Sequence, residues 1–194
     1  MTSKRIGVFG GTFDPPHVGH LVAAVNVAAQ LELSEVLFVV ANIPWQKMGT
    51  RAISAAPERL AMVELAVRDR NQLVASDVEI RRGGDSVTAD TLDELAVGCP
   101  DHEPIVIVGS DSAPGMATWR RPEELMRLAR VAVIDRPGSS GAIPPDGFDY
   151  EVVPCPLMDV SSQDIRDRVR DGLPIDYLVP DAVRDYIDTQ ALYQ

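Results

Sequence analysis

Short aliphatic runs alternate with helical patterns along almost the whole chain. The runs are continuous and rich in valine and isoleucine, which is typical of strands buried on both faces of a parallel sheet. The segments between them have the spacing of amphipathic helices. We therefore expect strands at residues 5–10, 36–41, 73–76, 105–109, 130–135 and 150–153, and helices at residues 18–31, 58–69, 89–97, 122–128, 162–171 and 180–188.

This alternation predicts an α/β fold, with a doubly wound, Rossmann-like parallel sheet and helices on both faces. The 194 residues suit one domain with a sizeable core and a cleft. We expect residues 1–194 to form that single domain, with a C-terminal helical part, from about residue 160 to residue 194, packed on it. In such sheets, ligands bind outside the carboxyl ends of the strands.

The net charge of the chain limits the kinds of partner that it can bind. Eighteen Lys and Arg residues face 29 Asp and Glu residues, so the formal net charge is −11. This balance argues against a broad nucleic-acid interface, and a phosphate site would need its positive groups concentrated locally. Apolar stretches stay well short of the roughly 20 residues that span a bilayer, and the N-terminus lacks a signal-peptide pattern. We expect a cytoplasmic protein that binds neither nucleic acid nor membrane.

The stretch from Gly10 to His20, GGTFDPPHVGH, joins the first strand to the first helix. Its two glycines allow the backbone to approach a ligand, and the positive end of the following helix points to the same place. If the helix begins near Pro16, His17 and His20 lie on one face of its first turn, where imidazoles can donate hydrogen bonds to phosphate. The stretch therefore predicts a phosphate site.

Other interpretations of the two histidines stay open at this point. They could be ordinary packing or surface residues, or they could bind a metal. The metal interpretation lacks partners, because His102 is the sole further histidine, and we expect no metal-binding residue. The stretch matches neither the GxGxxG nor the GxxxxGK[ST] fingerprint, so it predicts a different kind of phosphate loop.

The same stretch resembles the HxGH signature of the nucleotidyltransferase superfamily. In its full eleven-residue form it is similar to the bacterial nicotinate-mononucleotide adenylyltransferases of NAD biosynthesis. The resemblance implies an enzyme that transfers AMP from ATP to nicotinate mononucleotide and releases deamido-NAD and pyrophosphate. Later segments, RRGGDSVTADTL, GSD with a following WRRPEEL, and VSSQDIR, extend the resemblance over nearly the whole chain.

The loop after the second strand places Asn42, Trp45 and Lys47 together, and Lys4 is the sole other lysine in the chain. Residue chemistry leaves two interpretations, a phosphate-binding Lys47 or a solvated lysine beside a tryptophan that covers the edge of the core. The family carries a phosphate-contacting lysine in this loop, which the resemblance assigns to Lys47. This chain has PWQK where the family has Pro-Pro-His-Lys.

Three further positions carry expected roles from the resemblance. Thr88 matches a threonine that helps to bind the nicotinate group, although the family's preceding tyrosine is Val87 here. Asp111, directly after a buried strand, is expected to accept the ribose hydroxyls of ATP, and Trp119 to stack on the nicotinate ring. Helix capping alone is the alternative for Thr88 and Asp111.

Ser161 and Asp164 could form only a capping box, yet the same helix N-terminus can bind phosphate at the same time. The resemblance favours both roles and adds Arg166. The expected catalytic residues are His17, His20, Lys47 and Arg166. The expected ATP-binding residues are Gly10, Gly11, Thr12, Phe13, Gly109, Asp111, Arg136, Ser161 and Ser162, and those for nicotinate mononucleotide are Asn42, Trp45, Thr88 and Trp119.

The expected reaction needs no protein nucleophile, because the attacking phosphate oxygen is already ionised. Mg²⁺ is expected on the substrate phosphates rather than on protein ligands. A homodimer is expected from the resemblance alone. Two alternatives remain: a sister enzyme that uses nicotinamide mononucleotide, and a non-catalytic nucleotide sensor with the same fold. Phosphopantetheine adenylyltransferases and cytidylyltransferases share the fold and the HxGH motif, but fit the Thr88 and Trp119 segments less well.

Overall fold

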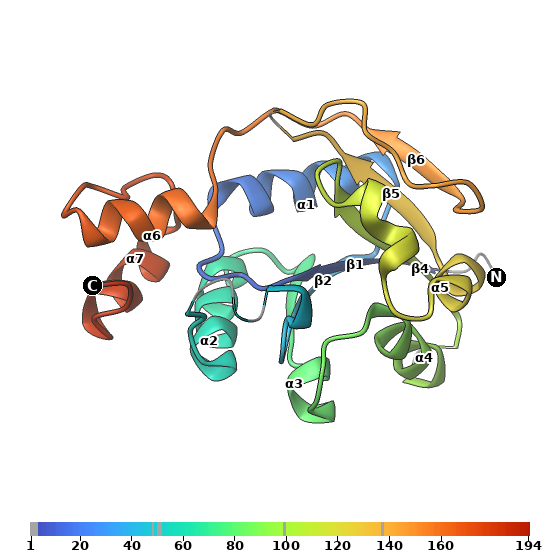
Figure 1. Cartoon of the computed structure of the whole chain (residues 1–194), viewed down its shortest axis with the longest axis horizontal. Helices are drawn as coiled ribbons and strands as arrows, with labels where there is room; N and C mark the ends of the chain where they lie inside the picture. Colours follow the sequence, from blue (N-terminus) through green and yellow to red (C-terminus); the bar gives the residue numbers. More distant parts are fainter. Residues whose placement is uncertain (1–3, 48, 50–51, 99, 137) are drawn as a thin grey trace.

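The computed structural model describes residues 4–47, 49, 52–98, 100–136 and 138–194 of the chain. Six parallel strands form one sheet in the order β3-β2-β1-β4-β5-β6 (Figure 1). The fold is thus the expected doubly wound α/β fold in a single domain. The strands are β1 (Lys4–Gly11), β2 (Glu35–Val40), β3 (Leu73–Ser76), β4 (His102–Gly109), β5 (Arg130–Ile134) and β6 (Tyr150–Val153).

The order of the strands explains where a site can form. Successive connections run outward from β1 in one direction to β3, and in the other direction from β4 to β6. The chain connections therefore diverge between β1 and β4, which leaves a crevice at the carboxyl ends of these two strands. The GGTFDPPHVGH stretch begins at the carboxyl end of β1.

Helices cover both faces of the sheet (Figure 1). All six expected helices are confirmed to within a few residues, whereas α3, η1 and η2 were not expected. The helices are α1 (Val18–Gln30), α2 (Ala56–Val67), α3 (Val78–Arg82), α4 (Thr88–Gly98), α5 (Pro122–Leu128), α6 (Ser162–Arg170) and α7 (Asp181–Thr189), with 3₁₀ turns η1 (Trp45–Lys47) and η2 (Ala113–Thr118).

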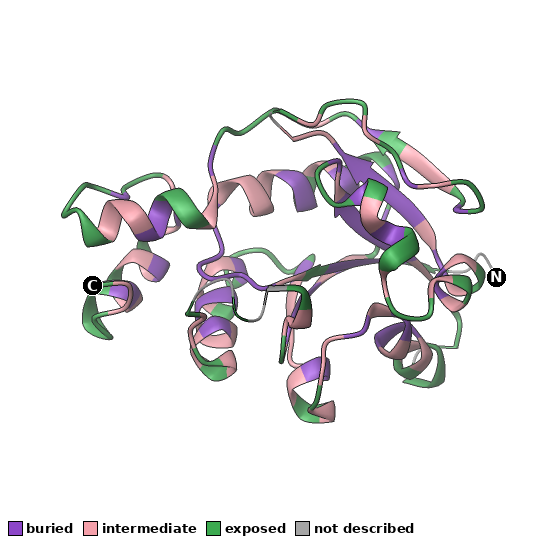
Figure 2. Cartoon of the chain, viewed as in Figure 1, coloured by how far each residue is buried: buried purple, intermediate pink, exposed green. Residues whose placement is uncertain are grey.

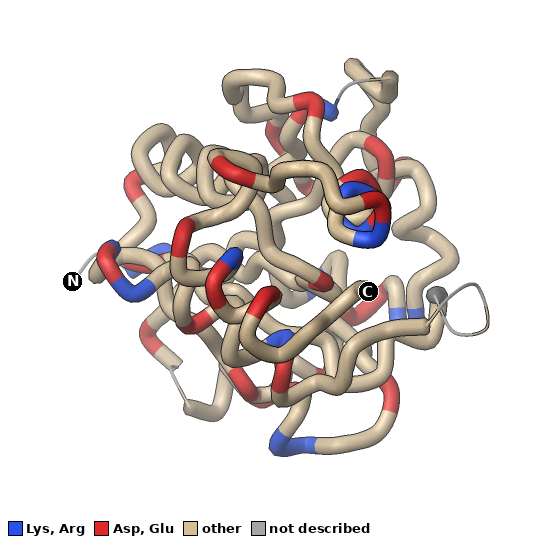
Figure 3. Tube along the Cα trace, turned by 90° about the vertical axis from the view of Figure 1, so that its left-hand side faces the viewer, with Lys and Arg blue, Asp and Glu red and all other residues tan. Residues whose placement is uncertain are grey.

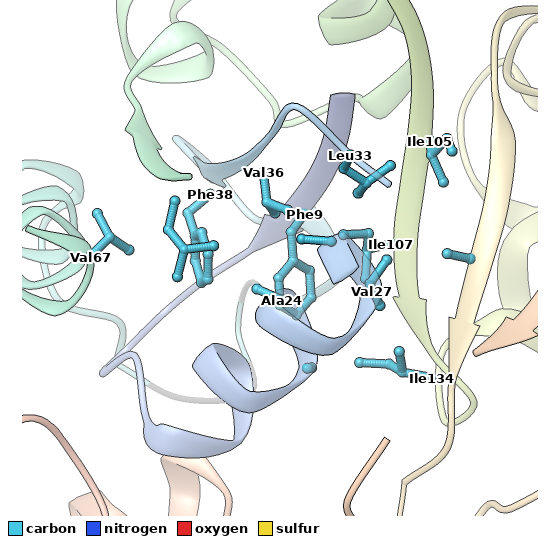
Figure 4. Packing of buried hydrophobic residues seen from close by; sticks show 14 of the residues in the cluster. Phe9, Ala24, Val27, Leu33, Val36, Phe38, Val67, Ile105, Ile107 and Ile134 are labelled. Atoms are coloured by element: carbon cyan, nitrogen blue, oxygen red, sulfur yellow. The ribbon is translucent and has the colours of Figure 1, made fainter. Parts of the chain in front are cut away.

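Each central strand contributes to two cores, because successive side chains point to opposite faces of the sheet. Phe9 packs with Ala24 and Val27 of α1 and with Phe38 of β2, as Figure 4 shows. The next residue back, Val8, belongs to the cluster on the other face, which α3, α4, α5 and η2 cover. Figure 2 shows the resulting concentration of buried residues in the central strands.

A third apolar cluster joins the C-terminal helices to α2. Ile165 of α6, Val183 and Ile187 of α7, and Met62 of α2 are all fully buried there. In Figure 1 these helices lie together at one end of the molecule, beside the start of α1. These contacts support the interpretation of residues 160–194 as a helical part packed on the same domain, which stays a prediction.

Carboxylates spread over many elements, with Lys and Arg residues among them (Figure 3). Several surface arginines are already held by carboxylates: Arg121 lies 2.5 Å from Asp90 and 2.8 Å from Asp93. Within the described ranges, no helix has both the length and the apolar character to cross a membrane.

Candidate active site

A cavity of about 500 Å³ opens at the carboxyl ends of the central strands. It brings together all of the predicted site residues except Asn42, which is not among the described lining residues, and Lys47, whose side chain lies outside what the structure describes. The predicted residues on its walls are Gly10, Gly11, Thr12, Phe13, His17, His20, Trp45, Thr88, Gly109, Asp111, Trp119, Arg136, Ser161, Ser162 and Arg166.

The turn after β1 needs a glycine for a steric reason. A Cβ atom on Gly11 would lie 2.7 Å from the ring of Phe13, which folds back over it. Phe13 has a positive φ of 49° and a buried ring, which packs against Phe38 and His20. The aromatic packing thus fixes the tight turn that leads to the histidines.

The helix α1 begins at Val18 rather than near Pro16, and His17 is its N-cap. His17 has an extended backbone, with a φ of −141°, so it precedes the helix instead of lying on its first turn. Its backbone N–H donates to Nδ1 of His20, with a distance of 3.1 Å. A ring nitrogen that accepts a hydrogen bond carries no proton, so this bond favours the tautomer of His20 with its proton on Nε2.

The two imidazoles nevertheless meet, as the sequence predicted. Their rings stack with centroids 3.7 Å apart. His17 is 1% exposed, and burial, assisted by the charge of Arg136 and opposed by that of Asp164, lowers its pKa from 6.5 to about 4. His17 is therefore neutral at pH 7, and its buried Nδ1 has no hydrogen-bond partner among the described residues.

The N-terminus of α6 lies against the turn after β1 and forms part of the cavity wall. The hydroxyl of Ser161 caps this helix by accepting from the backbone N–H of Asp164, at 3.1 Å. The neighbouring hydroxyl of Ser162 donates to the carbonyl of Pro15, at 2.8 Å. Capping is thus confirmed for Ser161, and both serines also lie on the cavity wall.

Arg166 reaches the same turn from α6. It is 7% exposed, its Nη1 donates to the carbonyl of Asp14 at 2.7 Å, and its Nη2 donates to Gln163. A guanidinium carries five N–H groups, so it can brace the turn and also face an anion in the cavity.

The end of β4 is also closely packed at a glycine. A Cβ atom on Gly109 would collide with the carboxylate of Asp111 and would lie 3.1 Å from Cγ of Arg136. Ser110 is fully buried, and its hydroxyl accepts from the backbone N–H of Arg136 at 2.9 Å. Asp111 itself is exposed at the cavity wall, and η2 begins with Ser112 as its N-cap.

Two loops that are far apart in sequence build the other end of the cavity. The side-chain amide of Asn42 donates to the carbonyl of Gly84 at 2.8 Å, and the indole N–H of Trp45 donates to the carbonyl of Ser86 at 3.1 Å. The backbone N–H of Ser86 donates in turn to Ile43, at 2.9 Å. Asn42 therefore links the two loops by a hydrogen bond without being a described lining residue, while Trp45 lines the cavity.

Arg120 covers this wall. Its guanidinium lies 4.8 Å from the centre of the Trp45 ring and 2.7 Å from the carboxylate of Asp85. It lines the cavity beside Trp119, and the buried hydroxyl oxygen of Ser86 has no hydrogen-bond partner among the described residues. This end of the cavity therefore combines indole rings with a guanidinium that is paired with a carboxylate.

The chain is similar to known proteins over nearly its whole length. A family model described as cytidylyltransferase-like matches residues 8–168. A protein of Streptomyces coelicolor named "Probable nicotinate-nucleotide adenylyltransferase" is 45% identical over 188 residues, which cover 95% of this chain and 98% of that protein. A protein of the same name from Exiguobacterium sibiricum is 42% identical over 189 residues, covering 97% and 98%. The chain belongs to the nicotinate-nucleotide adenylyltransferase family.

Membership of this family makes the chain an adenylyltransferase of the nucleotidyltransferase class, as the resemblance implied. Solved structures agree on the fold. The nicotinic acid mononucleotide adenylyltransferase of Plasmodium falciparum, solved in complex with NaAD, superposes with a TM-score of 0.80 at 19% identity, covering 98% of this chain and 97% of that one.

Sequence reasoning missed the buried charge of Arg59, which lies against the turn after β1. Arg59 of α2 is 1% exposed, and it donates to the carbonyls of Thr12 at 2.8 Å, Asn42 at 3.1 Å and Ser54 at 2.9 Å. It thereby ties the turn after β1 to the loop after β2. Its position in PERLAMVELA reads as an ordinary polar helix position, so the sequence pattern carries no signal for this role.

Arg120 and Ser86 were also missed, although both lie next to expected residues. Each lies in one of the family-like segments, but the resemblance assigned a role only to a neighbouring residue, Trp119 for Arg120 and Thr88 for Ser86. The signal that could have found Arg120 is its charge, because an acidic chain that binds phosphate or carboxylate needs cations at its site.

Proposed function

We propose that this chain transfers AMP from ATP to nicotinate mononucleotide and releases deamido-NAD and pyrophosphate. One observation carries the proposal: a single cavity joins the stacked histidines and the α6 N-terminus at one end to the indole-lined wall at the other. A transferase that brings two nucleotides together needs such a continuous cavity, because both reacting groups must be held in line.

In the proposed reaction, an ionised phosphate oxygen of the mononucleotide attacks the α-phosphorus of ATP. A bond forms from that oxygen to the α-phosphorus, and the bond from the α-phosphorus to the bridging oxygen of pyrophosphate breaks. The departing pyrophosphate takes the electron pair, so no protein base is required. The protein contributes alignment and stabilisation of the developing negative charge.

The catalytic residues of the proposal are those that meet around the turn after β1. His20 donates from Nε2, because its Nδ1 already accepts from the backbone of His17. His17, which is neutral in the free protein, donates one N–H to a phosphate oxygen. Arg166 and the free N–H groups at the start of α6 neutralise charge on the phosphates. Lys47 joins this set on the strength of the family resemblance.

ATP is proposed to lie against the turn after β1 and the end of β4. Gly10, Gly11, Thr12 and Phe13 supply the backbone at the phosphates. Asp111 accepts from the ribose hydroxyls, and Gly109, Arg136, Ser161 and Ser162 complete this part of the cavity wall.

The acceptor is proposed to lie at the indole-lined end. Trp119 stacks on the pyridine ring, Thr88 binds the nicotinate group, and Trp45 closes the wall that Asn42 supports. Arg120, whose guanidinium is paired with Asp85, adds a cation to this end, which favours a carboxylate over an amide. The positive charge of Arg120 is the reason to prefer nicotinate mononucleotide to nicotinamide mononucleotide as the acceptor.

A divalent cation is part of the proposal, and Mg²⁺ is the ion that suits ATP. Among the described residues no group of three or more His, Cys, Asp or Glu side chains is placed to hold a metal. Such a cavity fits a cation that is held mainly by substrate phosphates and water, and Asp111 is an exposed carboxylate on the described cavity wall. Mg²⁺ would supply charge neutralisation on the pyrophosphate.

A cytoplasmic location, a homodimeric assembly, and the lack of nucleic-acid or membrane partners are proposals that rest on the sequence and the resemblance. The net charge of −11 supports the exclusion of nucleic acid.

The proposed function is tested by measuring pyrophosphate release in three reactions: ATP alone, ATP with nicotinate mononucleotide, and ATP with nicotinamide mononucleotide. Release is expected to need an acceptor and to be faster with the acid. Faster release with the amide would favour the sister activity, and tight ATP binding without turnover would favour a sensor.

A further inference from the structure

Tyr193, the residue before the last, reaches into the turn after β1. Its hydroxyl donates to Oδ1 of Asp14 at 2.8 Å, across a separation of 179 residues. The same hydroxyl lies 3.8 Å from the sulfur of Met62, and the ring packs against the apolar cluster formed by α2, α6 and α7. The C-terminal segment is therefore in direct contact with the GGTFDPPHVGH stretch.

Asp14 is a connecting point between that segment and the cavity. It is 1% exposed, and it lies three residues before His17 on the cavity wall. Its Oδ2 accepts from the backbone N–H of Ser54 at 3.4 Å, and its carbonyl accepts from Nη1 of Arg166 at 2.7 Å. Asp14 thus contacts both Tyr193 and one of the proposed catalytic residues.

The hydroxyl of Tyr193 stays a donor at neutral pH. Burial, followed by the negative charge of Asp14 and the hydrogen bond to it, raises the pKa of Tyr193, whereas Ser54 and Arg166 oppose that shift. A protonated phenol beside a buried carboxylate forms a charge-assisted hydrogen bond, which is among the stronger bonds in a protein and is directional.

We propose that Tyr193 is a positioning residue for catalysis, which acts through Asp14 to hold His17 and Arg166 at the reacting phosphates. The side chain of Asp14 accepts a hydrogen bond from Tyr193, and its backbone carbonyl accepts one from Arg166. A rotation of Asp14 would therefore move Arg166 together with the turn after β1 that leads to His17. This inference rests on the proposed function, because its readout is the transfer reaction.

The test compares Tyr193→Phe, which removes only the hydroxyl, with Tyr186→Phe. Tyr186 packs on the same apolar cluster from α7, so it is a matched control for loss of a tyrosine hydroxyl there. Steady-state kinetics with ATP and nicotinate mononucleotide should show kcat reduced by about tenfold in Tyr193→Phe, with both KM values within about twofold of wild type. Tyr186→Phe should keep wild-type kcat. A merely structural role would lower thermal stability without this selective loss of kcat.

A second comparison tests the route through Asp14. In the Asp14→Asn background, adding Tyr193→Phe should change kcat by less than about twofold, because both substitutions act on the same contact. Equal kcat values for Tyr193→Phe and Tyr186→Phe would overturn the inference, and so would a full tenfold effect of Tyr193→Phe in the Asp14→Asn background. In both cases the wild-type chain would still catalyse the transfer, so the proposed function would stand. A wild-type chain without transfer activity would overturn the proposed function, and this inference with it.

Discussion

The imidazole rings of His17 and His20 stack with their planes 29° from parallel and their centroids 3.7 Å apart. This arrangement depends on one backbone hydrogen bond, from the N–H of His17 to Nδ1 of His20. It also suits a neutral His17, since burial penalises the charged imidazole. In the proposed function, the pair supplies oriented N–H donors to phosphate oxygens from the wall of the cavity.

Replacing His20 with Ala should lower kcat by at least about a hundredfold, because the substitution removes a donor aimed at developing charge. It also removes the acceptor that holds the backbone of His17. Pyrophosphate release under saturating substrates is the measurement.

His102→Ala is the matched control, since His102 lies on a separate, smaller cavity. It should keep wild-type kcat. Near-normal turnover of the His20 variant would contradict the proposed catalytic role.

The lowered pKa of His17 predicts a pH dependence of stability. Between pH 6.5 and about 4 the unfolded chain binds a proton at His17 that the folded chain does not bind. The contribution of neutral His17 is thus fully present above pH 6.5 and is lost as the pH falls toward 4. Urea unfolding at pH 7 and pH 4.5 should show that this residue accounts for a loss of about 2 kcal/mol.

The control for this experiment is His17→Gln, which cannot titrate in that range. The wild-type chain should lose about 2 kcal/mol more than the variant between the two pH values. Equal losses would mean that His17 is not buried as a neutral group.

A methyl group at Gly19 should force its neighbours to shift. A Cβ atom there would lie 3.0 Å from Nδ1 of His17 and 3.1 Å from Cγ1 of Val160. Gly19→Ala should lower kcat by about tenfold, because it displaces the His17 ring. The better helix propensity of alanine, worth about 1 kcal/mol, should offset part of the loss in stability.

Gly115→Ala provides the comparison, because nothing lies within 4 Å of a Cβ atom at that glycine. It should leave kcat unchanged. If the two variants behave alike in kinetics and melting temperature, the close packing of Gly19 does not control the site.

Much of this architecture follows from local patterns. The bounds of β3, β6 and α5 agree with the predicted residues, because buried aliphatic strands and a helix that begins at Pro122 are strong local signals. The short helix α3 was missed, since five residues followed by Gly83 give too little periodicity to distinguish a helix from a turn. Which residues share the cavity was also largely predictable, because parallel strands end at one edge.

The supporting contacts were not predictable in the same way. Arg59, which is buried, and Tyr193, which is half-buried, each make a hydrogen bond to a distant part of the chain, to Thr12 across 47 residues and to Asp14 across 179 residues. No pattern of local spacing reports such contacts, because they arise from the packing of α2 and the C-terminus against the turn. Residue roles at the cavity stay predictions, and the kinetic comparisons above address them individually.

Arg120→Gln should change the choice of acceptor more than the rate of the preferred reaction with ATP. Its guanidinium supplies the cation at the indole-lined end of the cavity, and neutralising it weakens binding of a carboxylate but not of an amide. The ratio of kcat/KM for nicotinate over nicotinamide mononucleotide should fall by about tenfold.

Arg121→Gln tests whether loss of any nearby charge has the same effect. Arg121 is paired with Asp90 and Asp93, and it is not among the described residues that line the cavity, so its substitution should leave the ratio unchanged. An unaltered ratio in Arg120→Gln would place the acceptor's carboxylate away from this residue.

The central claim is the transfer of the α-phosphate of ATP, with its adenosine, to the phosphate of nicotinate mononucleotide. ATP labelled at the α-phosphorus tests it directly when it is incubated with the wild-type chain, Mg²⁺ and nicotinate mononucleotide, and the products are separated. The label should appear in deamido-NAD, with one pyrophosphate released per dinucleotide. Label that stays in ATP, or that appears only in free AMP, would contradict the claim.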